Sequence, residues 1–583
     1  MPADGNAVLR SGNEAIARGA WEAGVAVGCG YPGTPSTEIL ETLARLPDVY
    51  CEWSPNEKVA LEVAVGASLG GGRAIATMKH VGVNVAADPL FSAAYLGVTG
   101  GLVVVSADDP GMHSSQNEQD NRFYARAARI PLVEPSTPDE ARRYTRAAFD
   151  LSERFDTPVL LRTTTRLSHG RGVVREAARA EPPRAAYRRD PRKHVLLPAH
   201  ARARHSRIEA ERMPGLAAEA EAWVERVPGT DARAFITAGA PFPYLREAFP
   251  DAAVLKLGIT YPLPVRAIRE FADTHAGTIM VVEELEPFLE EQIRALGIDV
   301  ERRVLPREGE ISVDVLRRAL APAPVASRPG STALPTLPNR PPVLCSGCGH
   351  RNVFRVLSEL DVIVAGDIGC YTLGALRPLD AMDTCMNMGA SIPMAHGLRQ
   401  VLPPEDARRV VSVIGDSTFF HSGIAGLLDV VHNGGGGTTL VLDNSTTAMT
   451  GHQDHPGVPS RLADGSAPAV DIPAVVRALG VRDVHVLDPY DQAGLRSAIE
   501  TAMASDEASV LVARAPCVLR ERVRFGEAPR IDARRCTDCH ACLDIGCPAL
   551  GVGEDGRPVI DGELCIACGL CGQVCNDCNA GID

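Results

Sequence analysis

The sequence predicts a multidomain α/β protein of doubly wound domains that ends in a small cysteine-rich domain. Short apolar runs alternate with amphipathic helical patterns over most of the chain, which is typical of parallel sheets covered by helices. At about 150 residues per domain, the 583 residues suggest about four domains. Eight of the sixteen cysteines fall between Cys536 and Cys575, so the tail differs in kind from the rest of the chain.

Composition and charge are those of an ordinary globular protein. Hydrophobic residues make up 45% of the chain and charged residues 23%. The net charge of -14 gives no reason to expect nucleic acid or an anionic membrane as the main partner. Residues 1–20 lack the apolar core of an export signal, and no run approaches about 18 apolar residues. We therefore expect a cytoplasmic protein without a membrane span, whose cysteines serve metal or redox chemistry rather than disulfides.

The first doubly wound domain is predicted at residues 1–175. Its helices are expected at Glu57–Leu69 and Asp139–Glu153, between buried parallel strands at Ala26–Cys29, Ala74–Met78, Leu102–Ser106 and Val159–Arg162. The basic, polar stretch 176–230 lacks periodicity and is interpreted as a linker.

Two further α/β domains are predicted at residues 231–322 and 343–525. The smaller one should have strands at Ala234–Thr237, Ala253–Lys256 and Thr278–Val282. The larger one should have strands at Val362–Ala365, Val410–Ile414, Thr438–Leu442 and Val510–Ala513. Residues 323–342 are rich in Pro, Ser and Thr and are expected to be an extended linker, and residues 526–583 form the cysteine-rich tail.

The cysteine spacing of the tail predicts two 4Fe–4S clusters. Three cysteines two residues apart can bind one corner of a cubane, while a distant fourth binds the other cluster. The two runs are Cys536-x2-Cys539-x2-Cys542-x4-Cys547-Pro548 and Cys565-x2-Cys568-x2-Cys571-x3-Cys575. One cluster is therefore assigned to Cys536, Cys539, Cys542 and Cys575, and the other to Cys565, Cys568, Cys571 and Cys547. The tail resembles the bacterial two-cluster ferredoxin domain. A zinc module is the alternative, and Cys578 could replace Cys575.

A metal and diphosphate site is predicted where two strands of the larger C-terminal domain end. Gly415-Asp416-Ser417 follows one strand, and Asn444 follows another, 28 positions after Asp416. Strand ends of an α/β sheet converge on a ligand, and Asp and Asn supply the oxygen ligands that Mg²⁺ prefers. The pattern resembles the thiamine-diphosphate fingerprint, with Ser417 in place of a glycine. By that resemblance Asp416, Asn444 and the Thr446 carbonyl would bind Mg²⁺, and the cofactor would also be faced by Gly366, Asp367, Ile368, Gly369 and Met449.

Glu57 is predicted to activate the thiamine cofactor. The pattern Glu57-x2-Ala60-x3-Ala64-x-Gly66-x-Ser68 resembles the helix that carries the activating glutamate in thiamine-diphosphate pyrimidine domains. The small residues would allow a neighbouring helix or backbone to approach closely. The alternative is an exposed acid at a helix start, stabilised by the helix dipole. In this enzyme class the two thiamine domains usually meet across a subunit interface, so Glu57 would serve the cofactor held by another copy.

Four cysteines of the larger C-terminal domain are predicted to bind a third 4Fe–4S cluster. They are Cys345, Cys348, Cys370 and Cys517. Their setting resembles that in the β subunits of 2-oxoacid:ferredoxin oxidoreductases, where such cysteines hold a cluster near thiamine. The alternative is four isolated buried cysteines. Cys29, Cys51 and Cys385 match no ligand position and are expected to be buried.

Long motifs extend the resemblance over nearly the whole chain, to the α subunits of the indolepyruvate ferredoxin oxidoreductase family. These motifs are Tyr31-Pro-Gly-Thr-Pro-Ser-Thr-Glu38, Met78-Lys-His-Val-Gly-Val-Asn84, Asp108-Asp-Pro-Gly-Met-His-Ser-Ser-Gln-Asn-Glu-Gln-Asp-Asn-Arg122, Asp367-Ile-Gly-Cys-Tyr-Thr372 and Ala448-Met-Thr-Gly451. The family order would then be a pyrimidine domain, a transketolase C-terminal-like domain, a diphosphate domain and a ferredoxin-type tail. Cys345-Ser-Gly-Cys-Gly-His350 departs from the CPGCPH expected in the family.

The resemblance implies oxidative decarboxylation of indolepyruvate or another arylpyruvate to aryl-acetyl-CoA. Thiamine diphosphate, Mg²⁺ and coenzyme A would take part, and 4Fe–4S clusters would pass electrons to ferredoxin. A separate β subunit would complete an (αβ)2 assembly. Thr34 would hydrogen-bond the substrate, and further pocket candidates are His80, His113, Ser114, Arg122, His452 and His455. The alternatives are another 2-oxo acid substrate, a non-oxidative thiamine-dependent decarboxylase, or an electron-transfer subunit with relic thiamine domains.

Overall fold

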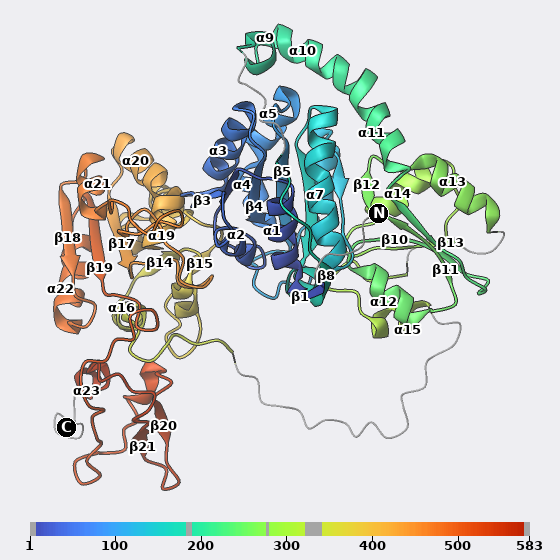
Figure 1. Ribbon diagram of the computed structural model, residues 1–583. Helices are drawn as coiled ribbons and strands as arrows, with labels where there is room; N and C mark the ends of the chain where they lie inside the picture. The colour runs from blue at the N-terminus through green and yellow to red at the C-terminus, as the bar shows by residue number, and fades with distance from the viewer. Residues whose placement is uncertain (1–6, 182–188, 276–278, 303, 321–340, 576–583) are drawn as a thin grey trace. The chain divides into compact units, whose positions relative to one another are not determined.

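The chain forms two compact units, residues 1–334 and 335–583. The computed structural model describes residues 7–181, 189–275, 279–302, 304–320 and 341–575 (Figure 1). The predicted extended linker, 323–342, lies almost wholly outside the described residues, as does Cys578. Each unit is built around a mainly parallel sheet, so the predicted α/β class is confirmed.

A seven-stranded sheet forms the centre of the first unit, in the order β12-β6-β7-β5-β4-β2-β3. All neighbours are parallel except β12 and β6. The strands are β2 (Val27–Gly30), β3 (Tyr50–Trp53), β4 (Ala74–Lys79), β5 (Leu102–Asp108), β6 (Leu132–Val133), β7 (Val159–Thr164) and β12 (Ile259–Tyr261). Strands β4, β5 and β7 are buried along their whole length, which confirms three of the predicted central strands.

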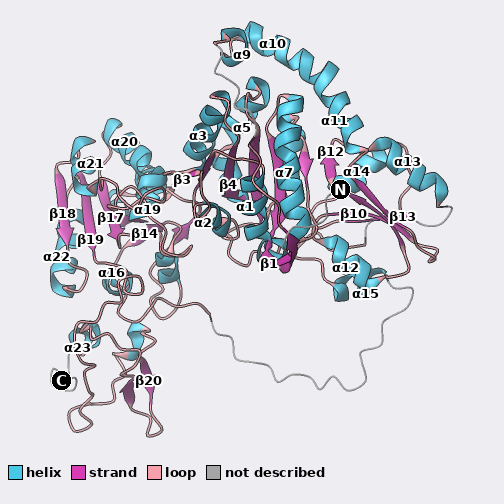
Figure 2. Ribbon diagram, viewed as in Figure 1, coloured by secondary structure: helices cyan, strands magenta, loops and turns pink. Residues whose placement is uncertain are grey.

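Helices cover both faces of this sheet (Figure 2). They are α1 (Gly12–Glu22), α2 (Thr37–Leu43), α3 (Glu57–Leu69), α4 (His80–Val85), α5 (Ala87–Leu96), α6 (Arg122–Ala128), α7 (Pro138–Phe155) and α8 (Thr165–His169). Helix α3 has the predicted bounds, because the Asn56 side chain caps it by accepting from the Val59 amide, 3.0 Å away. An antiparallel pair, β1 (Ala7–Ser11) with β8 (Arg171–Arg175), joins the two ends of this domain.

The smaller α/β domain is not fully separate from the first domain. Its own sheet has the order β13-β10-β11-β9. Its elements are β9 (Val224–Val227), β10 (Ala234–Ala238), β11 (Ala253–Leu257), β13 (Ile279–Val282), α12 (Pro241–Ala248), α13 (Val265–Thr274), α14 (Phe288–Ala295) and α15 (Val313–Leu320). Strand β12 follows β11 in sequence but pairs with β6, so this segment completes the sheet of the first domain.

The prediction of an aperiodic linker at 176–230 is wrong for most of that stretch. It contains α9 (Pro191–His194), α10 (Pro198–Arg207), a π-helical turn (Ile208–Arg212), α11 (Met213–Ala220) and β9. Helix α10 buries none of its residues, which explains why its sequence shows no apolar periodicity. The segment is anchored by Arg212, whose buried guanidinium donates to the Ala94 carbonyl at 2.6 Å.

A six-stranded parallel sheet forms the centre of the second unit, in the order β15-β14-β16-β17-β19-β18. The strands are β14 (Ile363–Gly366), β15 (Thr384–Cys385), β16 (Val410–Gly415), β17 (Gly437–Asp443), β18 (Asp483–Leu487) and β19 (Ala508–Arg514). The helices are α16 (Gly349–Leu357), α17 (Ser391–Val401), α18 (Pro404–Arg409), α19 (Asp416–Thr418), α20 (Ile424–His432), α21 (Ile472–Ala478) and α22 (Gln492–Met503). One apolar core lies between α16, α22 and the sheet, and another beneath α20 and α21.

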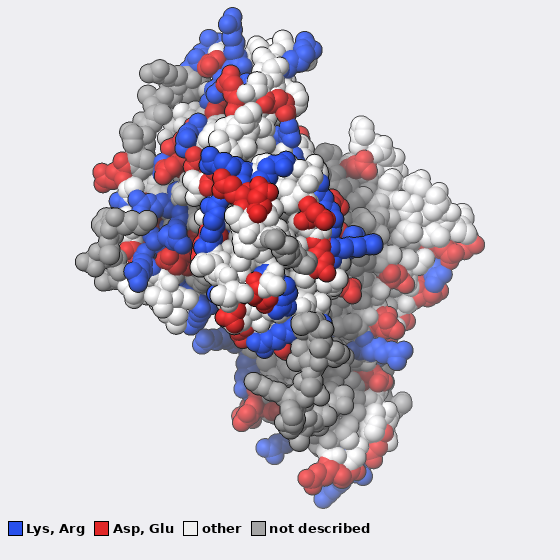
Figure 3. All heavy atoms as spheres, turned by 90° about the vertical axis from the view of Figure 1, so that its right-hand side faces the viewer, with Lys and Arg blue, Asp and Glu red and all other residues white. Residues whose placement is uncertain are grey.

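The tail of the second unit is small, with little regular structure. It contains β20 (Leu550–Val552) and β21 (Pro558–Ile560), which pair antiparallel, and α23 (Leu570–Val574). Within the described residues, no helix combines the length and apolar character that crossing a membrane requires. On the face shown in Figure 3, acidic and basic side chains are interspersed rather than segregated.

Candidate active site and cysteine clusters

The carboxyl ends of β16 and β17 bring together the two residues of the predicted metal site. The strands are parallel, and Gly415 pairs with Leu442, so Asp416 and Asn444 follow at the same edge. Asp416 accepts the Ser417 amide at 2.8 Å through Oδ1 and the Asn444 amide at 3.1 Å through Oδ2. His455 Nε2 also lies 3.1 Å from Asp416 Oδ2. The predicted pairing of Asp416 with Asn444 is therefore present.

The loop after β17 folds back over this edge. Asn444 Oδ1 accepts the Thr446 amide at 3.2 Å, and Thr446 Oγ1 donates to the Gln453 carbonyl at 3.3 Å. His452 has a φ of 69°, in the left-handed region that few residues other than glycine adopt. Met449 is 50% exposed, so it covers little of the site in this chain alone.

Asp367 has a structural position among the predicted cofactor residues. It is fully buried, and burial raises its pKa. Its Oδ1 accepts the Ile368 and Gly389 amides at 2.8 and 2.9 Å, and its Oδ2 accepts the Ser391 amide at 3.0 Å. The carboxylate therefore fixes the turn that begins α17, next to the strand end that Gly366 closes.

Tyr371 explains why glycines stand at positions 369 and 415. A Cβ atom at Gly415 would lie 2.6 Å from Tyr371 Cε1, and one at Gly369 would lie 2.4 Å from the same atom. The Tyr371 hydroxyl donates to the Ile368 carbonyl at 3.0 Å. The ring of Tyr371 thus occupies the space that larger side chains at these two positions would need.

His350 is a site residue that the sequence did not reveal. It is 7% exposed, and its ring meets Tyr371 edge-on, with 5.9 Å between ring centroids. Neither ring nitrogen has a hydrogen-bond partner among the described residues. Burial lowers the pKa of His350 to about 4, against the opposing charge of Asp416, so the imidazole is neutral. Buried polar atoms without partners are costly, so His350 is a candidate for contact with a bound ligand. Its position directly after the Cys345–Cys348 pair was the only available signal.

The four cysteines predicted for the proximal cluster lie together. The pKa of Cys370 is raised to about 12. The main cause is burial, and the neighbouring Cys348, Cys345 and Cys517 thiols add to it. Cys348 occupies the N-cap position of α16, and the Cys517 amide donates to the Asn444 carbonyl at 3.1 Å. This contact places the cysteine group beside the edge that carries Asp416. This proximity favours a shared site over four isolated cysteines, and the third cluster stays a prediction.

Seven tail cysteines lie near other members of their predicted groups, whereas the Cys575 amide donates to the Cys571 carbonyl, so its place in the first group stays a prediction. The pKa of Cys571 is raised to about 12. The main cause is burial, and the Cys568, Cys565 and Cys547 thiols add to it. These four cysteines line one hollow. In the other group, burial, and next Cys536 and Cys539, raises the pKa of Cys542. No group of three or more His, Cys, Asp or Glu in the described ranges has the close spacing of a single-ion site.

The proximal cysteines and the second tail group are neighbours. A Cβ atom at Gly347, between Cys345 and Cys348, would lie 3.4 Å from the Cβ atom of Cys568. Arg351 donates to the Ile545 and Gly546 carbonyls at 2.8 and 2.7 Å, and also to the Leu344 carbonyl. This buried guanidinium therefore ties the tail to the domain that carries the proximal group.

The three remaining cysteines are divided between core and surface. Cys29 and Cys51 are buried as predicted, at 0% and 1% exposure. The prediction for Cys385 is wrong, because it is exposed. It lies on the two-residue edge strand β15, which has only one neighbouring strand, and its thiol donates to the Asp367 carbonyl at 3.4 Å.

Glu57 is buried at the start of α3, with 5% of its surface exposed. A Cβ atom at Gly82 in α4 would lie 2.6 Å from Glu57 Oε1, so the carboxyl group packs directly on the α4 backbone. The alternative of an exposed helix-start acid is therefore wrong. Apart from the backbone of α3 itself, no atom of the described chain lies within 4 Å of a Cβ at Gly66, so the expected close approach does not occur there within this chain.

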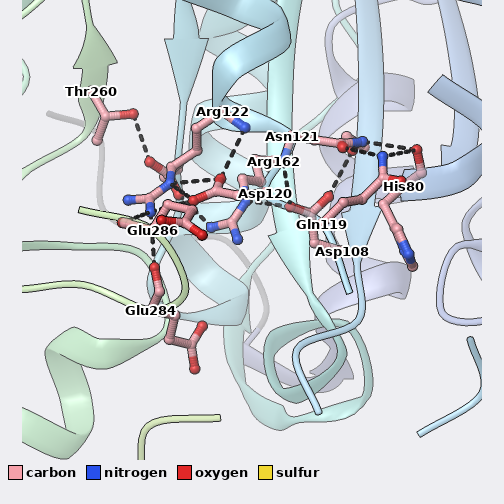
Figure 4. Close-up of polar contacts among 12 residues, drawn as sticks. His80, Asp108, Gln119, Asp120, Asn121, Arg122, Arg162, Thr260, Glu284 and Glu286 are labelled. Atoms are coloured by element: carbon pink, nitrogen blue, oxygen red, sulfur yellow. Dashed lines mark hydrogen bonds and ion pairs between the residues drawn. The ribbon is translucent and has the colours of Figure 1, made fainter. Parts of the chain in front are cut away.

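Two further predicted residues lie inside the first unit. His80 is fully buried, and its Nε2 lies 3.2 Å from the Asn117 carbonyl oxygen. Arg122 is 2% exposed and pairs with Asp120 at 2.6 Å (Figure 4). It also pairs with Glu283 at 2.6 Å. These bonds join the first domain to the smaller domain, which favours a structural role for Arg122.

Thr34 and Ser114 meet at one edge of the first sheet. Ser114 Oγ donates to the Thr34 carbonyl at 3.4 Å, and the Lys79 ammonium donates to the Ser114 carbonyl at 2.5 Å. His113 instead points to the smaller domain, where its Nε2 lies 3.2 Å from Glu310 Oε2. Lys79 was not predicted, because a lysine after an apolar run is usually solvated.

Two family models match the chain. The model described as pyruvate flavodoxin/ferredoxin oxidoreductase, thiamine diphosphate-binding, matches residues 18–227. The thiamine pyrophosphate enzyme C-terminal TPP-binding domain matches residues 367–513. A solved chain of 2-oxoglutarate:ferredoxin oxidoreductase from Magnetococcus marinus has a TM-score of 0.43 and 18% identity, over 50% of this chain and 60% of that chain.

Curated relatives match almost end to end. Indolepyruvate oxidoreductase subunit IorA of Archaeoglobus fulgidus is 43% identical over 612 residues, covering 98% of this chain and 97% of the relative. The subunit of the same name from Methanothermobacter marburgensis is 43% identical over 603 residues, covering 98% and 96%. The family predicted from the motifs is confirmed. The chain belongs to the family of indolepyruvate oxidoreductase subunit IorA, among the thiamine-diphosphate-dependent 2-oxoacid:ferredoxin oxidoreductases.

Proposed function

We propose that the chain oxidatively decarboxylates arylpyruvates such as indolepyruvate, forms aryl-acetyl-CoA, and passes the electrons through 4Fe–4S clusters to ferredoxin. The observation that carries the proposal is the first turn of α16. Cys348 occupies the N-cap position of this helix and lies among the proximal cysteines. His350, two residues later, lies buried against Tyr371 and within the field of Asp416. One helical turn would thus serve both the cofactor edge and the cysteine group that accepts its electrons.

The residues at this edge fit thiamine diphosphate with Mg²⁺. Asp416, Asn444 and the Thr446 carbonyl offer the oxygen ligands that Mg²⁺ prefers. A neutral His350 with two unpartnered ring nitrogens supplies a hydrogen bond that a diphosphate oxygen would accept. When bound, thiamine diphosphate supplies a nucleophilic carbon and an electron sink for loss of CO₂.

Glu57 is proposed to exchange a proton with the ring nitrogen of the aminopyrimidine. Its burial at the start of α3 and its contact with Gly82 support this role, because they fix the carboxyl group and exclude water from it. The cofactor that it serves would be the one held by another copy of the chain, in an (αβ)2 assembly with a separate β subunit.

The cysteine groups support a single order of electron transfer. The proximal group is Cys345, Cys348, Cys370 and Cys517. This proximal group would pass electrons to the adjacent group of Cys547, Cys565, Cys568 and Cys571. The contacts of Gly347 and Arg351 with the tail hold the two groups close together. The group of Cys536, Cys539, Cys542 and Cys575 would deliver them to ferredoxin. Thiolates suit this task because they stabilise iron–sulfur clusters.

The domain boundaries form part of the proposal. Residues 1–175 would be the pyrimidine domain and 343–525 the diphosphate domain. Residues 231–322 would be the transketolase C-terminal-like domain and 526–583 the two-cluster ferredoxin-type domain. The complex would act in the cytoplasm, with coenzyme A as co-substrate. His452 and His455 would contribute to the pocket beside Asp416.

The test is anaerobic reduction of a viologen dye by the purified αβ complex with coenzyme A. We expect indolepyruvate and phenylpyruvate to give higher kcat/KM values than pyruvate and 2-oxoglutarate. Glu57→Gln should abolish dye reduction. If the thiamine domains were relics, the same variant would reduce the dye as fast as the wild type. A preference for pyruvate would contradict the substrate class. Aldehyde release without dye reduction would favour the non-oxidative decarboxylase instead.

A further inference from the structure

Lys79 occupies a place where parallel sheets bind ligands. It is the last residue of β4, which lies between β2 and β5. The turn after β2 carries Gly33 and Thr34, and the loop after β5 carries Asp109 and Ser114. The carboxyl ends of adjacent parallel strands are the usual ligand-binding edge of such a sheet. A Cβ atom at Gly33 would lie 3.0 Å from Lys79 Cβ, so the Thr34 turn packs directly on this lysine.

The Lys79 ammonium is buried without an anionic partner. Lys79 is only 8% exposed, and its Nζ donates to the Ser114 carbonyl at 2.5 Å. In the described part of the chain no carboxylate oxygen lies within 4 Å of it. The charge of Asp109 acts to raise the pKa of Lys79. However, Asp109 Oδ2 already accepts hydrogen bonds from the Ser114 amide at 2.9 Å and from Ser115 Oγ at 2.5 Å. An ammonium has three donors, so Lys79 retains capacity for an anion.

Most other buried cations of the same unit have carboxylate partners, whereas buried Arg212 instead donates to the Phe155, Ala94 and Asp156 carbonyls. Lys256 pairs with Glu140, and Arg162 pairs with Asp108 at 2.6 Å and with Glu134 at 2.8 Å. A buried charge without such a partner is strongly unfavourable, and burial lowers the pKa of Lys79 to about 8. A cost of this kind at a ligand-binding edge marks a functional site.

We propose that the Lys79 ammonium binds the carboxylate of the 2-oxo acid substrate, with the Thr34 turn positioned against it by Ser114. The inference rests on the proposed function, because a 2-oxo acid is the anion that this enzyme class must bind. It assigns the anion to the first unit, whereas the diphosphate belongs to the edge at Asp416. The contact is an ion pair with hydrogen bonds, and no covalent bond to Lys79 forms.

The test compares a carboxylate with its neutral counterpart on the intact anaerobic complex. Phenyllactate keeps the carboxylate of phenylpyruvate but lacks the ketone, so it binds without reacting, and phenyllactamide lacks the charge. Calorimetry should show that the wild type binds phenyllactate roughly 10- to 100-fold more tightly than the amide, as for a hydrogen-bonded charge pair. Lys79→Gln should remove this preference, and Lys79→Arg should keep most of it. The KM for phenylpyruvate should rise by the same factor in Lys79→Gln, with a smaller change in kcat.

The matched control is Lys193→Gln. Lys193 Nζ also donates to a carbonyl at 2.5 Å, that of Val98, but it pairs with Asp156 away from this edge. This variant should keep the wild-type preference for phenyllactate. If Lys79→Gln does not fold, the affinities of the wild type and of Lys79→Arg for phenyllactate and phenyllactamide still test the inference.

Three outcomes would overturn the inference. They are equal affinity of the wild type for phenyllactate and its amide, an unchanged preference in Lys79→Gln, and a borohydride-trapped adduct of phenylpyruvate on Lys79. Failure of the proposed function looks different, because dye reduction would then be absent with every 2-oxo acid while Lys79-dependent phenyllactate binding persisted.

Discussion

Replacing Gly82 by alanine tests whether the reaction depends on the position of the Glu57 carboxyl group. The new Cβ would lie 2.6 Å from Glu57 Oε1, 2.7 Å from its Cγ and 2.9 Å from its Cδ. Favourable contacts between carbon atoms begin at about 3.5 Å, so the carboxyl group must move by about 0.5 to 1 Å. A misplacement of about 1 Å can cost on the order of 100-fold in rate. We therefore expect kcat for dye reduction to fall roughly 10- to 100-fold, or about 1.4 to 2.7 kcal/mol in the barrier.

The fold should tolerate this change. Alanine is favoured over glycine inside a helix by about 1 kcal/mol, which offsets part of the crowding in α4. The control is Gly397→Ala in α17, where a Cβ would have no neighbour within 4 Å. It should keep full activity and raise the thermal midpoint slightly. A Gly82→Ala complex with wild-type kcat would refute the role given to Glu57, since the carboxyl group would have moved without consequence.

Three further changes address other parts of the site. Asp416→Asn should weaken thiamine diphosphate binding in the presence of Mg²⁺ by roughly 10- to 100-fold, because a ligand charge is lost, and calorimetry that finds equal affinity would contradict the metal site. Gly347→Ala should slow reduction of the tail clusters in anaerobic stopped-flow while leaving thiamine binding intact, because its backbone has a φ of 66° and packs against the tail. The kcat/KM for the 2-oxo acid should fall as pH rises through about 8, because the lowered pKa of Lys79 makes the ammonium lose its proton there. Asp109 and His80 do not titrate in this range, because the pKa of each is lowered, and Lys79→Arg should remove the decline.

Buried strands and one capped helix could be predicted from the sequence because local signals determine them. The strands around Ala74–Met78 and Leu102–Ser106 are continuous apolar runs, and α3 begins after Asn56, a strong N-capping residue. Strand β12 could not be predicted, since it has three residues and pairs with β6 more than 120 positions earlier. Helix α10 was missed because it buries no apolar face.

The candidate site shows the same division between local and long-range information. Asp416, Asn444 and the cysteine groups were found because chemistry requires those residue types at regular spacing. Lys79 and His350 were missed because their importance comes from burial without a partner, which depends on loops that are distant in sequence. Arg122 was predicted as a pocket residue from its motif. Its interior ion pairs with Asp120 and Glu283 became apparent only from the fold.

We propose above all that bound thiamine and thiolate-held iron in one chain form a single electron path. The most direct measurement adds phenylpyruvate and coenzyme A to the anaerobic complex, without ferredoxin, and follows the iron–sulfur absorbance. We expect bleaching that requires thiamine diphosphate and that is lost in Glu57→Gln. An iron-containing complex whose absorbance does not change with any 2-oxo acid, although thiamine diphosphate is bound, would contradict the account.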